Sequence, residues 1–281
     1  YKTLDENIAT VTDAGLVTGQ KYGTTKIEVS TNKLPNKVLI DVQVLRKNDK
    51  TIAKTVSGTD FTLALKADGT VWTWGYNGYG QLGLGDNSNR YRPTQINIEN
   101  VVDIAAGNNH ALLVTADGKV YSFGSNSYGQ LGRTGNTYTP QEIPNLENIE
   151  KVSAGNYHSI ALDKDGNVYT WGYNGYGQLG LGNTTNTVLP VKVDDLEGII
   201  KIEAGNYTSY VIDNNNHLWS TGYNYYGELG NGSTSNRSKF TQIQTLENVS
   251  DVSASETNST IVLLSDGTVW GFGNNTNNQL T

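Results

Sequence analysis

The 281-residue sequence contains no cysteine and no methionine. The absence of cysteine excludes disulfide bonds, thiolate zinc sites and cysteine nucleophiles together. No stretch reaches the roughly 18 consecutive apolar residues that a membrane-spanning helix needs, so no membrane insertion is expected. The sequence begins at Tyr1 and shows no basic segment followed by an apolar one, which predicts that no signal peptide is present. Because the sequence has no methionine, not even a start residue is represented, and we expect a mature or excised piece of a longer product.

Glycine and asparagine are abundant, with 32 and 33 residues. Both residues tolerate positive φ, so the composition predicts many tight turns. Net charge is −7 overall, and it is unevenly distributed: residues 1–50 carry +2 and residues 51–281 carry −9. A surface that binds nucleic acid needs clustered lysine and arginine. Here the basic residues are scattered singly, so we expect no nucleic-acid partner.

One ten-residue pattern recurs along the chain. It first reads Trp-Gly-Tyr-Asn-Gly-Tyr-Gly-Gln-Leu-Gly, over residues 74–83. Its first glycine returns at intervals of 48 to 51 residues, as Gly75, Gly124, Gly172, Gly222 and Gly273. A period near 50 residues is typical of β-propellers, whose small sheets must stack to bury their faces.

Each repeat contains short runs with the period-two alternation of β-strands, and no segment has helical periodicity. The runs 63–65 and 71–74 flank Asp68-Gly69, and Asp-Gly between two strands predicts a hairpin whose two central residues both have positive φ. A further run, such as residues 101–104, ends each copy, and a run beside a proline precedes it. We therefore expect three or four strands in each repeat.

The segment Ala-Gly-Asn-Tyr-His-Ser-Ile-Ala-Leu at residues 154–162, followed by the glycine-rich pattern up to Gly180, resembles the regulator of chromosome condensation repeat family. The resemblance covers residues 53–281 and implies an all-β propeller of seven four-stranded blades. The repeats would supply about 4.5 of those blades, at residues 53–104, 105–152, 153–202, 203–252 and 253–281. The missing blades could lie on further sequence, which we favour, or another chain could complete the ring, or the arc could stack as an open solenoid.

The first fifty residues lack the repeat. Their runs at residues 23–29 and 37–45 resemble the second half of a bacterial immunoglobulin-like group 2 domain, which implies a partial β-sandwich. Residues 46–50 are charged and are expected to form a linker. We therefore divide the chain into a partial sandwich with its linker at residues 1–50 and propeller repeats at residues 51–281.

The histidines and carboxylates give no catalytic or metal-binding pattern. His110 and His158 occupy the same repeat position, and His217 lies in a hairpin turn, but a third convergent ligand is missing. Asp163 and Asp165 flank a turn, where nothing holds them across a cleft as a paired-carboxylate hydrolase requires. No nucleophile elbow of the Gly-x-Ser-x-Gly type occurs. We predict structural roles for these residues, with no catalytic residue, metal or cofactor.

Tyrosines are concentrated in the loop between the Trp-Gly and Gly-Gln-Leu-Gly elements. If the blades are equivalent, these tyrosines form an arc on one side of the propeller that suits protein or glycan binding. The alternative is that some of them pack between blades and fill the loop layer. The candidate residues are Tyr76, Tyr79, Tyr128, Tyr173, Tyr176, Tyr223, Tyr225 and Tyr226. The aromatic residues within the strands are expected in the core, namely Trp72, Trp74, Tyr169, Trp171, Trp219 and Trp270.

These patterns favour a non-catalytic binding or scaffold module of a secreted or surface-displayed bacterial protein, outside the cell. The sandwich would act as a spacer, and the propeller loops would hold a protein or glycan partner. Three alternatives remain: a glycan-active enzyme with its site at the propeller mouth, a protein inhibitor or exchange factor, and a structural repeat of a fibre. The exchange-factor alternative follows from the resemblance, since the founding member of the family activates a small GTPase and binds chromatin.

Overall fold

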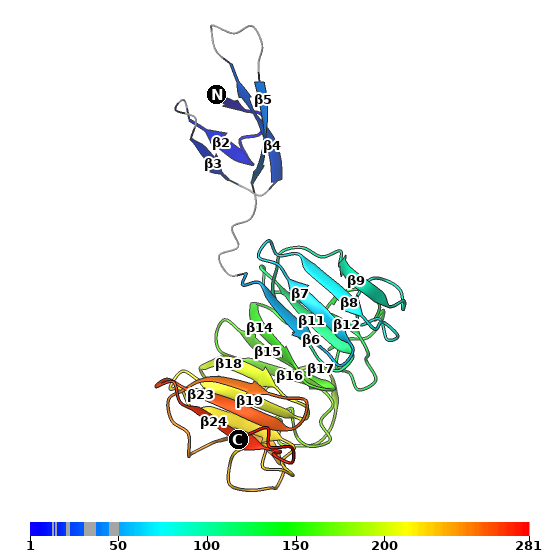
Figure 1. Ribbon diagram of the computed structural model, residues 1–281, viewed down its shortest axis with the longest axis vertical. Coiled ribbons are helices and arrows are strands. Elements are labelled where there is room, and N and C mark those ends of the chain that lie inside the picture. Colours follow the sequence, from blue (N-terminus) through cyan, green and yellow to red (C-terminus); the bar gives the residue numbers. More distant parts are fainter. Residues whose placement is uncertain (13, 15, 21–22, 31–37, 45–50, 281) are drawn as a thin grey trace. The chain divides into compact units, whose positions relative to one another are not determined.

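The computed structural model describes residues 1–280 except 13, 15, 21–22, 31–37 and 45–50 (Figure 1). The chain forms two compact units, Tyr1–Asp49 and Lys50–Thr281. All named elements are β-strands, and no helix in the described chain is long and apolar enough to cross a membrane. The charged segment predicted as a linker, residues 46–50, lies outside the described residues.

The N-terminal unit contains one antiparallel sheet and one hairpin. The sheet has the order β1-β4-β5, and β2 pairs with β3. Ala9 of β2 and Ile27 of β4 are its buried apolar side chains among the described residues. The strands are β1 (Lys2–Thr3), β2 (Ala9–Val11), β3 (Val17–Gly19), β4 (Gly23–Val29) and β5 (Val38–Val44).

The second unit consists of five successive antiparallel sheets, each of which takes its strands in chain order (Figure 1). The predicted all-β propeller fold is therefore confirmed. The first two sheets contain β6 (Lys54–Ser57), β7 (Phe61–Leu65), β8 (Val71–Gly75) and β9 (Arg90–Gln95), then β10 (Val101–Ala106), β11 (His110–Thr115), β12 (Val120–Gly124) and β13 (Gln141–Glu142). The third and fourth contain β14 (Ile149–Ala154), β15 (His158–Asp163), β16 (Val168–Gly172) and β17 (Thr187–Lys192), then β18 (Ile199–Ala204), β19 (Thr208–Asp213), β20 (Leu218–Gly222) and β21 (Arg237–Gln242). The fifth has three strands, β22 (Val249–Ala254), β23 (Ser259–Leu264) and β24 (Val269–Gly273).

The sheets are shifted along the chain by one strand relative to the sequence repeats. The run that ends the first repeat forms β10, which is the first strand of the second sheet and pairs there with β11. The first strands of consecutive sheets, such as β10 and β14, lie side by side. Each repeat therefore contributes strands to two neighbouring sheets.

The hairpin turns differ in one respect from the sequence prediction. Gly69 has a φ of 80°, but Asp68 does not have a positive φ. The turn is closed by hydrogen bonds from the Gly69 N–H to the Lys66 carbonyl and from the Lys66 N–H to the Thr70 carbonyl, both 2.9 Å. This is a type I turn followed by one left-handed residue, which also suits the twist of a hairpin. In the fourth sheet Asn216, with a φ of 63°, takes the place of the glycine.

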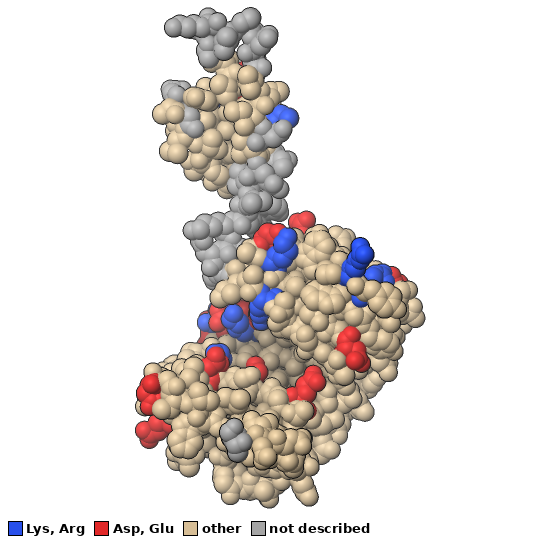
Figure 2. Space-filling view, in the orientation of Figure 1, with Lys and Arg blue, Asp and Glu red and all other residues tan. Residues whose placement is uncertain are grey.

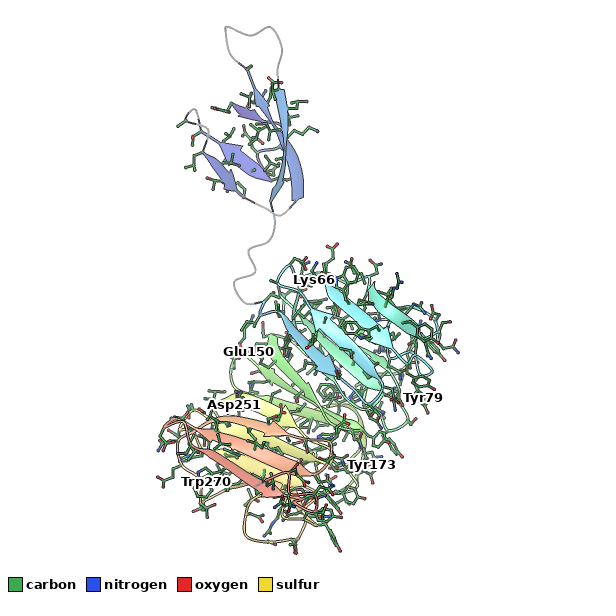
Figure 3. The ribbon with its side chains drawn as sticks, viewed as in Figure 1. Lys66, Tyr79, Glu150, Tyr173, Asp251 and Trp270 are labelled. Carbon is green, nitrogen blue, oxygen red and sulfur yellow. The ribbon has the colours of Figure 1, made fainter. Side chains whose placement is uncertain are left out.

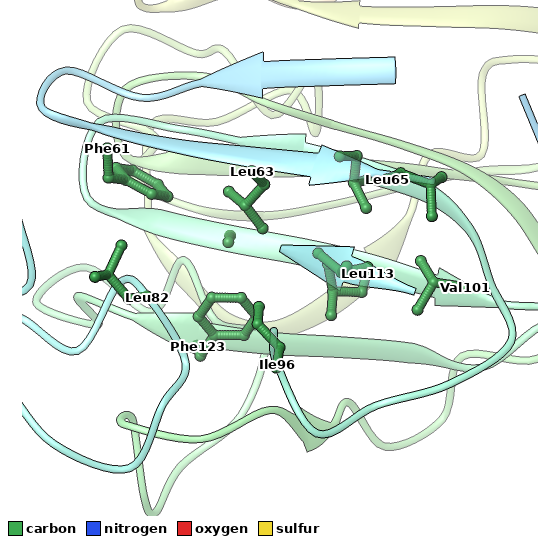
Figure 4. Packing of buried hydrophobic residues seen from close by; sticks show 11 residues of the cluster. Phe61, Leu63, Leu65, Leu82, Ile96, Val101, Leu113 and Phe123 are labelled. Carbon is green, nitrogen blue, oxygen red and sulfur yellow. The ribbon is translucent and has the colours of Figure 1, made fainter. Parts of the chain in front are cut away.

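The hydrophobic core lies between consecutive sheets. Figure 4 shows Leu63 and Leu65 of β7 facing Leu113 of β11 and Phe123 of β12, and all four side chains are buried. Burying a leucine or phenylalanine side chain stabilises a fold by about 1.5–3 kcal/mol. Because similar clusters fill the next three interfaces, stacking of the sheets is the main stabilising arrangement.

The last sheet has one uncovered apolar face. Ile261, Leu263 and Val269 are 48%, 38% and 64% exposed, although their equivalents in the preceding sheet, Tyr210, Ile212 and Leu218, are buried. Trp270, expected in the core, is 54% exposed (Figure 3). It pairs with the buried Val262 and so lies on the other face, and in the described chain β24 has no fourth strand beside it as β20 has β21. Trp171 is fully buried as expected, and the other strand aromatics that were placed in the core are partly buried.

Candidate functional site

The tyrosine-bearing loops all lie at one margin of the propeller sheets. In an antiparallel sheet the loop after the first strand and the loop after the third strand lie at the same end. In the third sheet these loops are residues 155–157 and 173–186. Figure 3 shows Tyr79 and Tyr173 along this margin, with Glu150 and Asp251 along the opposite one.

A fully buried asparagine organises the long loop of the first, third and fourth sheets from within. In the third sheet, Asn174 accepts a hydrogen bond from the Leu179 N–H at 3.0 Å, and its amide donates to the Asn183 and Thr185 carbonyls, each at 3.0 Å. Asn77 and Asn224 make equivalent contacts in the first and fourth sheets. Because these bonds satisfy the loop's own polar groups, the loop is ordered without a ligand.

A second polar side chain fixes the backbone of the following tyrosine. Gln178 accepts a hydrogen bond from the Tyr176 N–H at 3.0 Å, and Gln130 accepts one from the Tyr128 N–H at 2.9 Å. In the fourth sheet Glu228 replaces the glutamine and accepts from the Tyr226 N–H at 2.8 Å. Burial raises the pKa of Glu228. The repeated Gly-Gln-Leu-Gly element therefore positions the tyrosine in front of it.

A glycine leaves room for one of the rings. A Cβ atom at Gly175 would lie 2.2 Å from the hydroxyl oxygen of Tyr173, so the tyrosine ring folds back over this position. Tyr225 occupies the equivalent position in the fourth sheet, where its ring stacks with that of Tyr223 at 6.5 Å. The same loop geometry therefore carries two tyrosines in one sheet and three in the next.

Eight tyrosine rings from three successive sheets form one continuous network, which we call the tyrosine surface. Neighbouring ring centroids are 4.9–6.5 Å apart, mostly edge to face. Such pairs contribute about 0.5–1.5 kcal/mol beyond the area that they bury. The members are Tyr128, Tyr157, Tyr173, Tyr176, Tyr207, Tyr223, Tyr225 and Tyr226.

The tyrosine surface includes six of the eight tyrosines that the sequence singled out. The remaining two, Tyr76 and Tyr79, pair with each other at 6.2 Å in the first sheet. Tyr128, Tyr225 and Tyr226 are exposed, and the other members are partly buried. The network therefore combines packing between loops with a face open to solvent.

Sequence reasoning missed Tyr157 and Tyr207, which link the rings of adjacent sheets. Both follow the Ala-Gly-Asn element in the loop between the first and second strands. Tyr207 contacts Tyr157, Tyr173, Tyr176 and Tyr223. The repeat position of Tyr157 and Tyr207 could have indicated this contact, because the two loops at one end of an antiparallel sheet lie close together.

Hydrogen bonds between neighbouring sheets hold this margin rigid. The Asn156 N–H donates to the Asn206 carbonyl at 3.0 Å, and the Asn206 amide donates to Oδ1 of Asn258 at 3.0 Å. Below these loops, Nε2 of the buried His158 lies 3.0 Å from Oγ of Ser209 in the next sheet. His158 therefore braces two neighbouring sheets, whereas the sequence suggested a structural histidine that braces a loop.

The tyrosine surface is free of exposed charge from its own loops. Besides tyrosine, those five loops contain two ionisable residues, Arg133 and Glu228, which are 4% and 1% exposed. The Arg133 guanidinium donates to the Ser122 and Asn136 carbonyls at 2.6 and 2.7 Å. Partial burial raises the pKa of Tyr173, Tyr207 and Tyr223 above the usual phenol value, so their hydroxyls stay neutral.

Charged residues elsewhere on the propeller are mixed in sign. On the face that Figure 2 shows, lysines and arginines lie singly or in small groups among aspartates and glutamates. Several are paired, such as Lys239 with Asp195 at 2.7 Å and Lys119 with Glu142 at 2.9 Å. This face therefore presents no extended basic patch for a nucleic-acid backbone.

A second candidate site is a cavity of about 240 Å³ where the first strands of the sheets meet. Its lining includes Lys54, Asn156, Glu203 and Glu256. Burial is the main cause, and the nearby Asp251 carboxylate a smaller one, of a Glu203 pKa raised to about 7. Glu203 accepts a hydrogen bond from the Ala254 N–H at 3.4 Å, which joins it to the next sheet.

The carboxylates singled out in the sequence have local structural contacts. Asp163 accepts hydrogen bonds from the Asp165 and Asn167 N–H groups at 3.0 and 2.9 Å, which closes the hairpin turn. Asp213 makes the equivalent bonds and also contacts Nδ1 of His217 at 3.1 Å. Across the described ranges, no three histidine, aspartate or glutamate side chains converge as metal ligands would.

Three solved structures share this fold. Yeast RCC1 (Prp20), in its complex with Kap60, has a TM-score of 0.72 and 19% identity, over 84% of this chain and 60% of that one. Human WBSCR16 has a TM-score of 0.70 and 23% identity, over 84% and 65%. Prp20p from Saccharomyces cerevisiae, in a structure described with its binding to Gsp1p and histones, has a TM-score of 0.70 and 22% identity, over 78% and 57%.

This chain thus spans 60% of the length of yeast RCC1 (Prp20). Identities below 25% establish a shared fold only. The partners named for those proteins are not assigned to this chain. The sequence itself gives the family, since residues 10–281 match the RCC1-like domain. The tandem Gly-Gln-Leu-Gly loops and the successive antiparallel sheets agree with that match, and the chain belongs to the RCC1-like domain family.

Proposed function

We propose that this chain is a non-catalytic binding module in which ordered loops at one margin of a propeller hold a partner against the tyrosine surface. The observation that carries the proposal is the continuous contact of eight tyrosine rings from three sheets. The partner is a protein or a glycan. No bond is made or broken in this function.

The physical chemistry of tyrosine supports a binding role. A tyrosine offers a large apolar ring and a polar hydroxyl, and it loses little side-chain entropy when it makes a contact. The buried Asn174 and Gln178 order the loop before any partner arrives. Binding to a surface that is already ordered avoids part of the entropy cost of association.

The setting of the module is part of the proposal. We propose an extracellular protein of a bacterial surface, in which the N-terminal unit is the second part of an immunoglobulin-like spacer. The small antiparallel sheet β1-β4-β5 with the separate β2–β3 hairpin supports that assignment. The propeller repeats would supply about 4.5 of seven blades, and the open apolar face around Ile261 and Val269 supports the presence of further blades from other sequence or another chain.

An enzyme is the second candidate, because Glu203 places a carboxyl of raised pKa, about 7, beside the cavity. A general acid needs such a group. A turnover that Glu203→Gln abolishes while Tyr173→Ala leaves it intact would favour this candidate over the binding module.

The binding proposal is tested with the purified chain, fluorescently labelled, on intact bacterial and animal cells. The double variant Tyr173→Ala/Tyr223→Ala removes two rings of the tyrosine surface, one from the third sheet and one from the fourth. Tyr91→Ala is the matched control, because Tyr91 is 93% exposed on β9 and lies outside the network. We expect the double variant to lose binding and the control to keep it; equal binding by both would refute the proposal.

A further inference from the structure

We propose that the ligand of the tyrosine surface is a linear, uncharged polysaccharide. This inference rests on the proposed function and names the chemical class of its partner. The starting point is charge. The five loops that carry the rings expose no lysine, arginine, aspartate or glutamate side chain, because Arg133 and Glu228 are buried.

A charged ligand would find no counter-charge on this surface. Nucleic acids and acidic polysaccharides need clustered cations, and residues 51–281 carry a net charge of −9. A basic peptide would need exposed carboxylates. The partly buried phenols of Tyr173 and Tyr223 add no carboxylate-like charge, since their pKa values are raised and they stay neutral. An uncharged ligand meets no such penalty.

Exposed groups on the same loops are hydrogen-bonding but neutral. Asn183, Thr184 and Thr234 are exposed on the loops of the third and fourth sheets. A pyranose ring combines an apolar C–H face with polar hydroxyls at its edge. Tyrosine rings match the apolar face, and the neighbouring amides and hydroxyls can both donate to and accept from sugar hydroxyls.

The arrangement of the rings favours an extended ligand over a single sugar. From Tyr128 the path runs to Tyr173 at 5.0 Å, to Tyr176 at 6.0 Å and to Tyr223 at 4.9 Å. Each step is comparable with the length of one monosaccharide in a linear chain. The path crosses three sheets, so several sugar units would contact rings at the same time.

Affinity electrophoresis tests this inference on the full 281-residue chain. The gels contain one polysaccharide each: soluble β-glucan, mannan, xylan or galactan as neutral probes, and polygalacturonate as the acidic probe. We expect at least one neutral probe to retard the protein, and polygalacturonate not to do so. Retardation should be the same in low and high salt, because screening affects charge interactions only.

Variants connect the retardation to the tyrosine surface. Tyr173→Ala/Tyr223→Ala should weaken binding by about tenfold, equivalent to about 1.4 kcal/mol. Tyr91→Ala should leave it unchanged. Tyr176→Phe keeps the ring and removes its hydroxyl, so it should retain most of the binding if stacking dominates.

Two results separate failure of this inference from failure of the proposed function. If the neutral probes neither retard the protein nor compete for its tyrosine-dependent binding to cells, and protease treatment of the cells removes that binding, then the partner is a protein. The binding module would stand and the polysaccharide would be refuted. If Tyr173→Ala/Tyr223→Ala changes no binding in either assay, both are refuted.

Discussion

Nε2 of His110 lies 3.0 Å from Oγ of Ser159, so a fully buried histidine of the second sheet is hydrogen-bonded to the third. His158 and Ser209 repeat this contact between the third and fourth sheets. Burial lowers the pKa of His110 to about 3 and that of His158 to about 4. Both imidazoles must therefore be neutral in the folded chain, and protonation opposes folding.

Acid should destabilise the chain through these two histidines. A group with a depressed folded pKa contributes its full stability above the unfolded pKa, near 6.5 for histidine, and loses it as the pH falls towards the folded value. At pH 5 each histidine should lower the free energy of unfolding by about 2 kcal/mol relative to pH 7.5. Urea unfolding at pH 7.5 and pH 5 measures this loss. His158→Thr, which copies the equivalent Thr208, should lose less stability between pH 7.5 and pH 5 than the unchanged chain. An equal loss in both would contradict the role given to the buried histidine.

Glu203 should produce the opposite pH dependence. Its pKa is raised to about 7, mainly by burial, so the folded chain holds a proton that the unfolded chain releases near pH 4.5. Stability should therefore fall as the pH rises from about 4.5 through 7. Glu203→Gln keeps a carbonyl acceptor for the Ala254 N–H and should stabilise the chain at pH 8 by about 2–3 kcal/mol. The same variant should gain little at pH 5, and an equal gain at both pH values would rule out titration as the cause.

Two leucines at the same repeat position should respond differently to truncation. Leu162 of β15 is fully buried against the next sheet, whereas Leu263 of β23 is 38% exposed. Leu162→Ala should cost about 2–5 kcal/mol, because it leaves a cavity. Leu263→Ala should cost less than about 1 kcal/mol. Chemical denaturation of the two variants compares them directly, and similar costs would mean that the face of the last sheet is covered in solution.

Removing the asparagine inside a loop should loosen the tyrosine surface. Asn174→Ala leaves the Leu179 N–H and the Asn183 and Thr185 carbonyls without their partner. We expect a loss of about 2–4 kcal/mol and faster hydrogen exchange at the Leu179 amide. Thr184→Ala, an exposed change in the same loop, is the control and should do neither. Exchange at Leu179 that stays slow in Asn174→Ala would contradict the role assigned to this side chain.

The regular features of the fold were predictable from the sequence. The spacing of Gly75, Gly124 and Gly172 indicated the repeats, and alternation within each repeat indicated short antiparallel strands. Turn geometry was only partly predictable: Gly69 has the expected positive φ, and Asp68 does not. A dipeptide pattern gives the preferred turn residues, but the length of the loop between paired strands decides the turn type.

Contacts between sheets were harder to predict. Trp270 resembles the other strand aromatics in sequence, but β24 has no fourth strand beside it in the described chain, whereas β21 lies beside Trp219 of β20. Tyr157 and Tyr207 lie in short loops that are distant in sequence from the long tyrosine-rich loops, so their contacts follow only from the way the strands pair. Asn174 was counted among the turn-forming asparagines, and its burial at the centre of a hydrogen-bond network follows only from the three-dimensional path of the loop.

The contacts between sheets have a consequence for folding kinetics. Ser159 is 49 residues beyond His110, Ser209 is 51 residues beyond His158, and Asn258 is 52 residues beyond Asn206. Each sheet is thus tied to the one that precedes it by about one repeat, as in a linear array. Nucleation can begin in any interior pair of sheets and spread outwards without closing a long loop, and the three-stranded last sheet, with one neighbour, should exchange its amide hydrogens first.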